Sequence, residues 1–307
     1  MHLFAPKYYK KFKCIASECK HSCCVDWEID IDKAAVKRYK SLKSDYKDTL
    51  ISSIYTDKTE GVSHFKLKKD GKCPHLNDIG LCKIILELGE DYLCDICREH
   101  PRFYNCTARG CEVGIGAVCE EACKIILESD GYSEIEAIGE AKGNAPIPAY
   151  DAAAERERIY SILSDKSAPY ESRLSKIRKM YKINLAAFSD DEWRCTLSEL
   201  EYIEEKNASL FGRYSSTVTA PAEREIYLER FLAYLIYRHA SEAKSERDFR
   251  KALAFSLFCE RLFASLIKAE NPKNQDELIN LARIISMEIE YSTENKDSIL
   301  IDMEFII

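Results

Sequence analysis

Cysteine is concentrated at one end of this chain. Twelve of the fourteen cysteines lie between Cys14 and Cys123, and the later ones are Cys195 and Cys259. Cysteines gather in this way to form extracellular disulfides, to bind metals as thiolates or to carry out redox chemistry. Such clustering indicates chemistry rather than packing.

The composition of the chain helps to choose among these uses. Residues 1–13 carry four lysines and have no apolar core of signal-peptide length. No run of about eighteen uncharged apolar residues occurs, so we expect no membrane span. We therefore expect a cytoplasmic protein. In a reducing compartment, dense cysteine more often binds metal than forms disulfides.

The charge differs between the two halves. Residues 1–125 hold 21 Lys or Arg and 19 Asp or Glu, whereas residues 126–307 hold 24 and 33. An acidic second half argues against a nucleic-acid partner, because binding to phosphates needs clustered cations. It would attract a lysine-rich partner, although a solvated surface of acidic helices is the simpler explanation.

We predict a mainly α protein in two parts, which 307 residues can accommodate. Residues 1–130 form a cysteine-rich metal-binding module with short strands, one of them near 63–68. Residues 131–149 form a linker interrupted by glycine and proline, and residues 150–307 form an all-helical domain. Apolar periodicity predicts helices at 150–165, 170–188, 190–206, 222–243, 246–269 and 275–294. The fourth and fifth should be the buried pair, and the tail 299–307 should dock as a strand or last turn.

The spacing of the early cysteines favours metal binding. They run Cys14-x4-Cys19-x3-Cys23-Cys24, then Cys73-x8-Cys82, Cys94-x2-Cys97, Cys106-x4-Cys111 and Cys119-x3-Cys123. A tetrahedral zinc ion or a cubane iron-sulfur cluster needs four such ligands, and a close pair lets one turn present two thiolates. Residues 26–77 separate two of these groups, so folding must bring them together. Cys195 and Cys259 are instead expected to be inert buried cysteines.

Three other motifs carry less weight. Cys19-x3-Cys23 begins like the motif of radical enzymes that use S-adenosylmethionine, but Asp26 stands where a third cysteine is needed. Cys94-x2-Cys97 has the spacing of a redox pair, but no thioredoxin-like unit is readable around it. The run from Glu112 to Gly116 resembles a nucleotide-binding glycine turn, which needs a preceding apolar strand and a following helix. Because cysteines flank it on both sides, we expect instead a short strand with close backbone approach beside the metal.

Further residues accompany the cysteines in a specific pattern. The pattern is Cys14-x4-Cys19-x3-Cys23-Cys24-x2-Trp27, Cys73-Pro74-x-Leu76, Gly80-Leu81-Cys82, Leu88-Gly89, Cys97-x2-His100-Pro101-Arg102 and Cys119-x-Glu121-Ala122. It resembles that of a known family, the bacterial flagellin lysine N-methylases and related zinc- or iron-chelating cysteine-cluster proteins. The resemblance covers roughly residues 8–127, and the helix Phe231–His239 extends it.

The resemblance implies a set of metal ligands and two cofactors. The cofactors are a 4Fe-4S cluster, with zinc as the alternative metal, and S-adenosylmethionine as methyl donor to surface lysines of flagellin. The implied ligands are Cys14, Cys19, Cys23, Cys24, Cys73, Cys82, Cys97 and Cys119. This assignment leaves Cys94, Cys106, Cys111 and Cys123 as extra cysteines.

Candidate catalytic residues lie outside the cysteines. Tyr234, Tyr237 and His239 share one predicted helix with Arg238, and the spacing places Tyr234 beside Tyr237 and Arg238. Tyrosines around an amine can orient its lone pair and exclude water. A surface position for His239 is the alternative.

Candidate cofactor-binding residues are Trp27, Arg102 and Arg238. The indole of Trp27 can stack on a cation or on adenine, and an arginine can clamp a carboxylate through two hydrogen bonds. The alternatives are a core position for Trp27 and a structural ion pair for Arg102. His100, close to Cys97, is a candidate metal ligand or a partner of one.

Our interpretation is a protein-lysine N-methyltransferase that uses S-adenosylmethionine and acts on flagellin or another lysine-rich protein, without a nucleic-acid or membrane partner. The alternative is a noncatalytic zinc- or iron-binding module that binds a protein partner through its acidic helical domain. Iron, sulfide and donor binding would favour the enzyme, whereas zinc without donor binding would favour the module.

Overall fold

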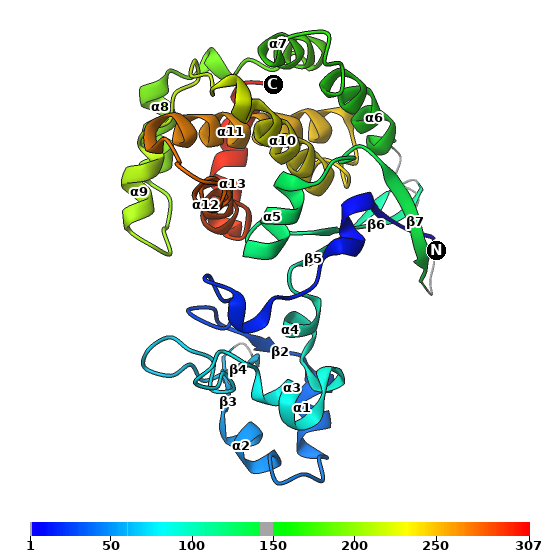
Figure 1. Ribbon diagram of the computed structural model, residues 1–307, viewed down its shortest axis with the longest axis vertical. Helices are drawn as coiled ribbons and strands as arrows, with labels where there is room; N and C mark the ends of the chain where they lie inside the picture. The colour runs from blue at the N-terminus through cyan, green and yellow to red at the C-terminus, as the bar shows by residue number, and fades with distance from the viewer. Residues whose placement is uncertain (1, 60, 108, 142–149) are drawn as a thin grey trace. The chain divides into compact units, whose positions relative to one another are not determined.

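The computed structural model describes residues 2–59, 61–107, 109–141 and 150–307, with only the backbone at residue 106. The chain divides into two units (Figure 1). The helical unit comprises Met1–Phe12 and Phe103–Ile307, and the cysteine unit comprises Lys13–Arg102. No helix in the described ranges combines the length and the apolar character needed to cross a membrane. Residues 1–12 belong to the helical unit, residues 13–102 form the cysteine unit, and the chain returns to the helical unit at Phe103.

This division differs from the boundaries that the sequence predicts at residues 130 and 150. Residues 103–130 group with the helical unit, and the first part of the predicted linker contains the strand β7 (Ile135–Glu140). The second part, residues 142–149, lies outside the described residues. The physical reason is strand pairing, because the first residues of the chain need neighbours on both edges.

The helical unit contains a four-stranded sheet in the order β5-β6-β1-β7. Strand β1 (His2–Pro6) runs parallel to β6 (Gly110–Ile115) and antiparallel to β7. Strand β5 (Arg102–Thr107) lies at the edge beyond β6. Every residue of β6 is buried, so this strand forms the inner part of the sheet.

The rest of this unit is mainly helical, as predicted. Helices α10 and α11 pack against each other, and the Phe231 and Phe263 rings meet edge to face with centroids 5.2 Å apart. This pair is buried along most of its length, which confirms it as the core of the domain. The helices are α5 (Glu120–Glu128), α6 (Ala152–Leu163), α7 (Tyr170–Tyr181), α8 (Asp190–Ser198), α9 (Lys206–Phe211), α10 (Glu225–His239), α11 (Glu246–Glu270), α12 (Gln275–Ile285) and α13 (Thr293–Asp302).

Two predicted helices are too long, and each has a local cause. Helix α7 stops at Tyr181 because Lys182 adopts a left-handed conformation with φ of 53°. The helix predicted over 190–206 breaks after Ser198. The buried Glu288 carboxylate accepts the amides of Ile203 and Glu204 at 2.8 and 3.2 Å, so these residues cannot continue a helix.

The C-terminal region also differs from the helix predicted over residues 275–294. Helix α12 ends at Ile285 and continues as a π-helix over Ser286–Glu290. The tail is helical, with α13 followed by a 3₁₀ turn at Met303–Phe305, so the last-turn alternative is confirmed over the strand. The π-helix buries two carboxylates, Glu288 and Glu290, within one turn.

The cysteine unit is small and irregular. Its three-stranded sheet has the order β2 (Asp30–Ile31), β4 (Ser63–Phe65), β3 (Ile54–Thr56), which confirms the strand predicted near residue 63. Its core is a single group of nine buried residues that includes Tyr39, Phe65 and Cys94. Its helices are α1 (Lys33–Lys40), α2 (Lys47–Ser52), α3 (Lys83–Leu88) and α4 (Asp95–Glu99).

A buried ion pair joins the sheet to the helices of the helical unit. Arg156 of α6 donates two hydrogen bonds to the Glu112 carboxylate of β6, at 2.5 and 2.6 Å, and a third to Ser241 Oγ at 2.6 Å. Both charged side chains are 2% exposed. Two charges withdrawn from water this completely depend on each other.

We expect the Glu112→Gln substitution to lower the free energy of unfolding by about 3–5 kcal/mol, because it leaves the Arg156 guanidinium buried without a counter-charge. The matched control is Glu157→Gln, which removes an exposed pair with Arg109 and should cost less than about 1 kcal/mol. Urea denaturation followed by circular dichroism measures both. Equal losses in the two variants would contradict the role of burial.

Candidate functional site

Five thiols of the cysteine unit lie on backbone elements that hold one another. The amide of Cys73 donates to the carbonyl of Cys24 at 2.8 Å, and Leu76 forms a bridge with Cys82. Cys82 stands immediately before α3, and Cys94 immediately before α4, which contains Cys97. We call Cys24, Cys73, Cys82, Cys94 and Cys97 the thiol cluster.

The pKa shifts show that these thiols are close enough to interact. Burial is the main cause that raises the pKa of the Cys73 thiol to about 11, and negative charge on Cys24, Cys82 or Cys94 contributes to the same rise. A hydrogen bond from the Cys97 thiol lowers the pKa of Cys94, and the same bond together with burial raises the pKa of Cys97. The Cys94-x2-Cys97 pair therefore favours one thiolate and one thiol.

A second pair repeats this arrangement. A hydrogen bond from the Cys23 thiol lowers the pKa of Cys24 to about 7, against the opposing effect of burial. Backbone amides also point at the cluster, since those of His75, Ile84 and Ile85 stabilise charge on the neighbouring Cys73 and Cys82 thiols. Amides directed at sulfur favour the thiolate, which is the form that binds metal.

His75 helps to hold the loop of Cys73 through hydrogen bonds at both ring nitrogens. Its imidazole is 1% exposed and lies between Tyr46 Oη, at 2.6 Å from Nδ1, and Ser53 Oγ, at 2.8 Å from Nε2. Ser53 donates its own proton to the Leu50 carbonyl, so Nε2 must donate to Ser53 and Nδ1 must accept from Tyr46. Burial lowers the pKa of His75 to about 4, which keeps the ring neutral. Both nitrogens are thus engaged in holding the loop that carries Cys73.

The thiol cluster fits a thiolate-bound metal in the chemistry of its donors and in its N–H···S contacts. Among the described residues, however, no three Cys, His, Asp or Glu side chains are arranged to hold one ion. The described cysteines are thiols.

The cluster overlaps with the ligand set that the sequence suggested but does not coincide with it. Cys94, taken as an extra cysteine, interacts with Cys73, Cys82 and Cys97. Its Cys-x2-Cys spacing was the signal that could have placed it in the set. Cys14 is exposed, and its sulfur accepts the amide of Ala16 at 3.4 Å.

Other predicted ligands and extra cysteines lie elsewhere. Cys119 belongs to the helical unit, where it precedes α5. Cys123 is buried in that helix, and its thiol faces the Ile279 carbonyl at 3.5 Å, so it is a packing residue. Cys259 is buried as predicted, but Cys195 is exposed on α8, so that prediction was wrong. The side chain of Cys106 lies outside the described residues.

A second polar cluster, in the helical unit, collects three of the predicted site residues around Glu290. His239 Nε2 lies 2.7 Å and Arg238 Nε 3.5 Å from Glu290 Oε2. The Tyr234 hydroxyl lies 3.0 Å from the same oxygen and also accepts the amide of Ala117 at 3.0 Å. The Arg238 guanidinium stacks on the Tyr291 ring, 4.3 Å from its centroid. We call these five side chains the Glu290 cluster.

Glu290 and Tyr291 were missed by sequence reasoning. Glu290 is the last residue of the π-helix and Tyr291 follows it, and nothing in the local sequence pairs them with a helix some fifty residues earlier. Burial alone would raise the pKa of Glu290, but Arg238 and His239 lower it, so the carboxylate stays ionised. Burial lowers the pKa of His239, despite the opposing effect of Glu290.

Tyr237 does not join its predicted neighbours. Its hydroxyl donates to the Val113 carbonyl at 3.1 Å, and the Arg156 guanidinium lies 4.9 Å from its ring centroid. The side chain is 1% exposed, so it ties α10 to the sheet. Burial holds the pKa values of Tyr234 and Tyr237 well above the ordinary value.

The remaining predicted residues lie in the cysteine unit. Trp27 packs against the small core of that unit, which matches the alternative of a core position. Arg102 donates to the Arg98 carbonyl at 3.3 Å, and His100 precedes a cis proline, Pro101.

The glycine turn after Glu112 has a packing explanation. Residues 112–115 of this run lie within strand β6, as the expected short strand, and α5 begins only at Glu120. A Cβ atom on Gly114 would lie 2.2 Å from the Phe103 ring, and one on Gly116 would lie 1.9 Å from the Tyr291 hydroxyl. Side chains already occupy the space beside both glycines, so the expected close approach is made by the protein itself.

We expect His239 to make the helical unit less stable as the pH falls below about 6.5. Its pKa in the folded state is lowered, so the unfolded state takes up the proton first and stability is lost. The stability difference between the parent and His239→Gln should therefore shrink between pH 7 and pH 5. Glu260, whose pKa burial raises to about 7, acts in the opposite sense but is present in both proteins.

Urea denaturation monitored by Trp193 fluorescence, in a Trp27→Phe background, isolates the helical unit, because each unit holds one tryptophan. A stability difference that does not change with pH would contradict the assignment to His239.

Comparison with known proteins finds distant relatives of this chain. Two proteins named Lysine-N-methylase, from Salmonella typhimurium and Salmonella choleraesuis, are each 27% identical over 213 residues, which cover 64% of this chain and 51% of the relative. A Flagellar biosynthetic protein FliU from Salmonella muenchen is 28% identical over 165 residues, which cover 51% of this chain and 94% of that protein. No protein-family profile and no solved structure matches. The chain spans about half the length of the methylases, and these distant relatives support the resemblance to flagellin lysine methylases.

Proposed function

We propose that this protein is a protein-lysine N-methyltransferase that uses S-adenosylmethionine to methylate surface lysines of flagellin or of a similar lysine-rich protein. The observation that carries the proposal is the similarity to two proteins named Lysine-N-methylase. The thiol cluster supports it, because the same family resemblance led us to expect a cysteine-bound metal in this segment.

The proposed reaction is a single displacement. The neutral Nζ of the substrate lysine attacks the methyl carbon of the donor, the carbon–sulfur bond breaks, and S-adenosylhomocysteine leaves. The methylated ammonium then loses a proton to solvent. The protein must therefore bind a deprotonated lysine in line with the sulfonium and exclude water from the reacting atoms.

The thiol cluster is the proposed metal site. Four of its five cysteines would hold a 4Fe-4S cluster or, as the alternative, zinc. When bound, either group would supply a thiolate crosslink that joins α3, α4 and the loops before them. The displacement requires no electron transfer, so we assign the crosslink a structural role.

The excess of acidic residues in the second half supports the choice of substrate. Residues 126–307 carry nine more acidic than basic residues. Opposite charges steer association with a lysine-rich partner and make it sensitive to salt. The rival proposal, a noncatalytic metal module, uses the same acidic helical domain for binding alone.

We expect Cys94→Ala to lower the metal content of the anaerobically purified protein, because Cys94 lies within the thiol cluster. Cys14→Ala is the matched control, since Cys14 is exposed and should keep full metal content. Iron, sulfide and zinc analysis, with the visible absorption spectrum, gives the readout. Loss of metal in Cys14→Ala but not in Cys94→Ala would contradict the assignment.

We expect the purified protein to transfer labelled methyl groups from S-adenosylmethionine to flagellin, with mass spectrometry locating them on lysines. Flagellin with its surface lysines acetylated is the control substrate and should accept none. A protein that retains metal and binds flagellin but transfers no methyl group would leave the noncatalytic module as the function.

A further inference from the structure

Two members of the thiol cluster, Cys94 and Cys97, lie on the same helical turn. Cys94 directly precedes α4, and the amide of Arg98 donates to its carbonyl at 3.0 Å, which closes the first turn of that helix. The thiol of Cys97 and the backbone amide of Cys97 both donate to the sulfur of Cys94. The two sulfurs are therefore already neighbours, whereas the other members of the cluster come from different segments of the chain.

Helix α1 holds this turn in place. Its N-cap, Asp32, accepts the amide of Asp95 at 2.9 Å. One turn further along α1, the guanidinium of Arg38 donates to the carbonyl of Leu93 at 2.9 Å. The residues on both sides of Cys94 are thus anchored to the same helix. Because the backbone around the pair is fixed, the two sulfurs are positioned to react with each other.

The backbone of this turn suits a disulfide. Residues three apart on one helical turn have Cα atoms about 5 Å apart, which is inside the range of roughly 4.4–6.8 Å that disulfides span. Cys23 and Cys24 also share a hydrogen bond, but they are adjacent in sequence. Adjacent Cα atoms are only about 3.8 Å apart, so a disulfide between them would be strained. Of the two hydrogen-bonded thiol pairs, Cys94–Cys97 is the one that can be oxidised without distortion.

We propose that Cys94 and Cys97 form a reversible disulfide, and that this bond closes the thiol cluster to metal. A zinc ion or a cubane cluster takes four ligands, and the thiol cluster provides five. Oxidation of the pair leaves Cys24, Cys73 and Cys82, which are too few. The disulfide follows from the geometry of the turn alone, whereas its effect on metal rests on the metal site of the proposed function.

The oxidant is a small-molecule disulfide, and the reaction is two successive thiol–disulfide exchanges. Cys97 is the more exposed of the pair, so its sulfur attacks the oxidant and breaks the oxidant's S–S bond, while its proton passes to Cys94 along their hydrogen bond. The thiolate released from the oxidant then takes this proton. The Cys94 sulfur attacks Cys97 and expels the second half of the oxidant as a thiolate. The pair loses two electrons, and the oxidant gains them.

Oxidation of the metal-free full chain in glutathione buffers tests the proposal. The chain is stripped with a chelator, reduced, and equilibrated at increasing ratios of oxidised to reduced glutathione. Acid quenching, alkylation of the remaining thiols and peptide mass spectrometry then locate each disulfide. After glutathione is removed, competition with a chromogenic chelator measures the zinc affinity of the same samples. Cys97→Ser cannot form the bond, and Cys195→Ser is the matched control, since it changes an exposed thiol of the helical unit.

We expect the Cys94–Cys97 disulfide to form before any other in the chain and to weaken zinc binding by about tenfold or more, with recovery on reduction. Cys195→Ser should behave as the parent does. In Cys97→Ser, the same treatment should leave the zinc affinity unchanged. Zinc bound to the parent in advance should protect the pair from oxidation.

A first disulfide between other cysteines would overturn the proposal. A Cys94–Cys97 disulfide that leaves the zinc affinity of the parent unchanged would overturn the effect on metal. Neither result bears on methyl transfer, because that assay uses the reduced, metal-loaded protein. Absence of methyl transfer there, with the disulfide and its effect on zinc both observed, would count against the proposed function and support the redox control of the thiol cluster.

Discussion

The pairing of β1 with β6 and β7 is the constraint on which the rest of the structure depends. The first strand of the chain completes a sheet whose other members lie between residues 102 and 140. Because β1 occupies an interior position, the helical unit cannot close its sheet without the N-terminus. The cysteine unit is consequently an insertion whose two ends both leave from the helical unit.

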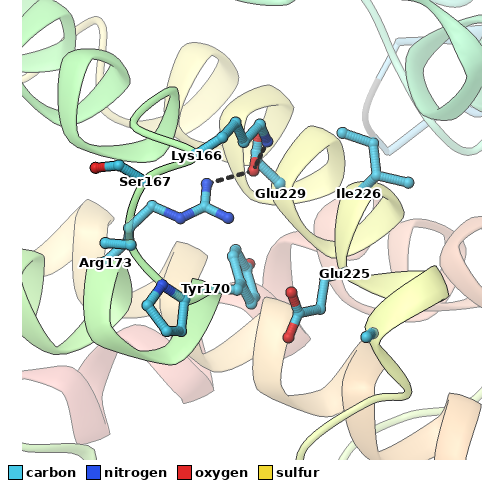
Figure 2. Close-up of a pocket in the computed structure, with 10 residues that line it drawn as sticks. Lys166, Ser167, Tyr170, Arg173, Glu225, Ile226 and Glu229 are labelled. Atoms are coloured by element: carbon cyan, nitrogen blue, oxygen red, sulfur yellow. Dashed lines mark hydrogen bonds and ion pairs between the residues drawn. The ribbon is translucent and has the colours of Figure 1, made fainter.

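Buried charges fix the helices around that sheet. The Glu112–Arg156 pair joins β6 to α6, Glu229 joins α10 to the start of α7 (Figure 2), and Glu288 holds the segment between α8 and α9 by accepting the amides of Ile203 and Glu204. Each carboxylate is almost fully withdrawn from water and is compensated by donors from a segment distant in sequence. Charges buried in this way impose specificity, since an alternative packing would leave them unpaired.

The two polar clusters differ in what they have available for chemistry. In the Glu290 cluster, most of the polar groups already satisfy one another, so its geometry describes a packed network that links α10 to the π-helix. The thiol cluster is different, because negative charge on one sulfur raises the pKa of its neighbours, so a common cation would let several of them ionise together.

The sequence by itself determined the helical class of the second half, the α10–α11 core and the concentration of thiols in one segment. These features follow from local periodicity and spacing, which a single chain displays directly. Only the tertiary structure decided that β1 belongs to the helical unit, that Cys94 rather than Cys14 joins the thiol cluster, and that Glu290 gathers Tyr234, Arg238 and His239. Strand pairing and the compensation of buried charge act between residues far apart in the chain, and no local pattern records which partner satisfies which group.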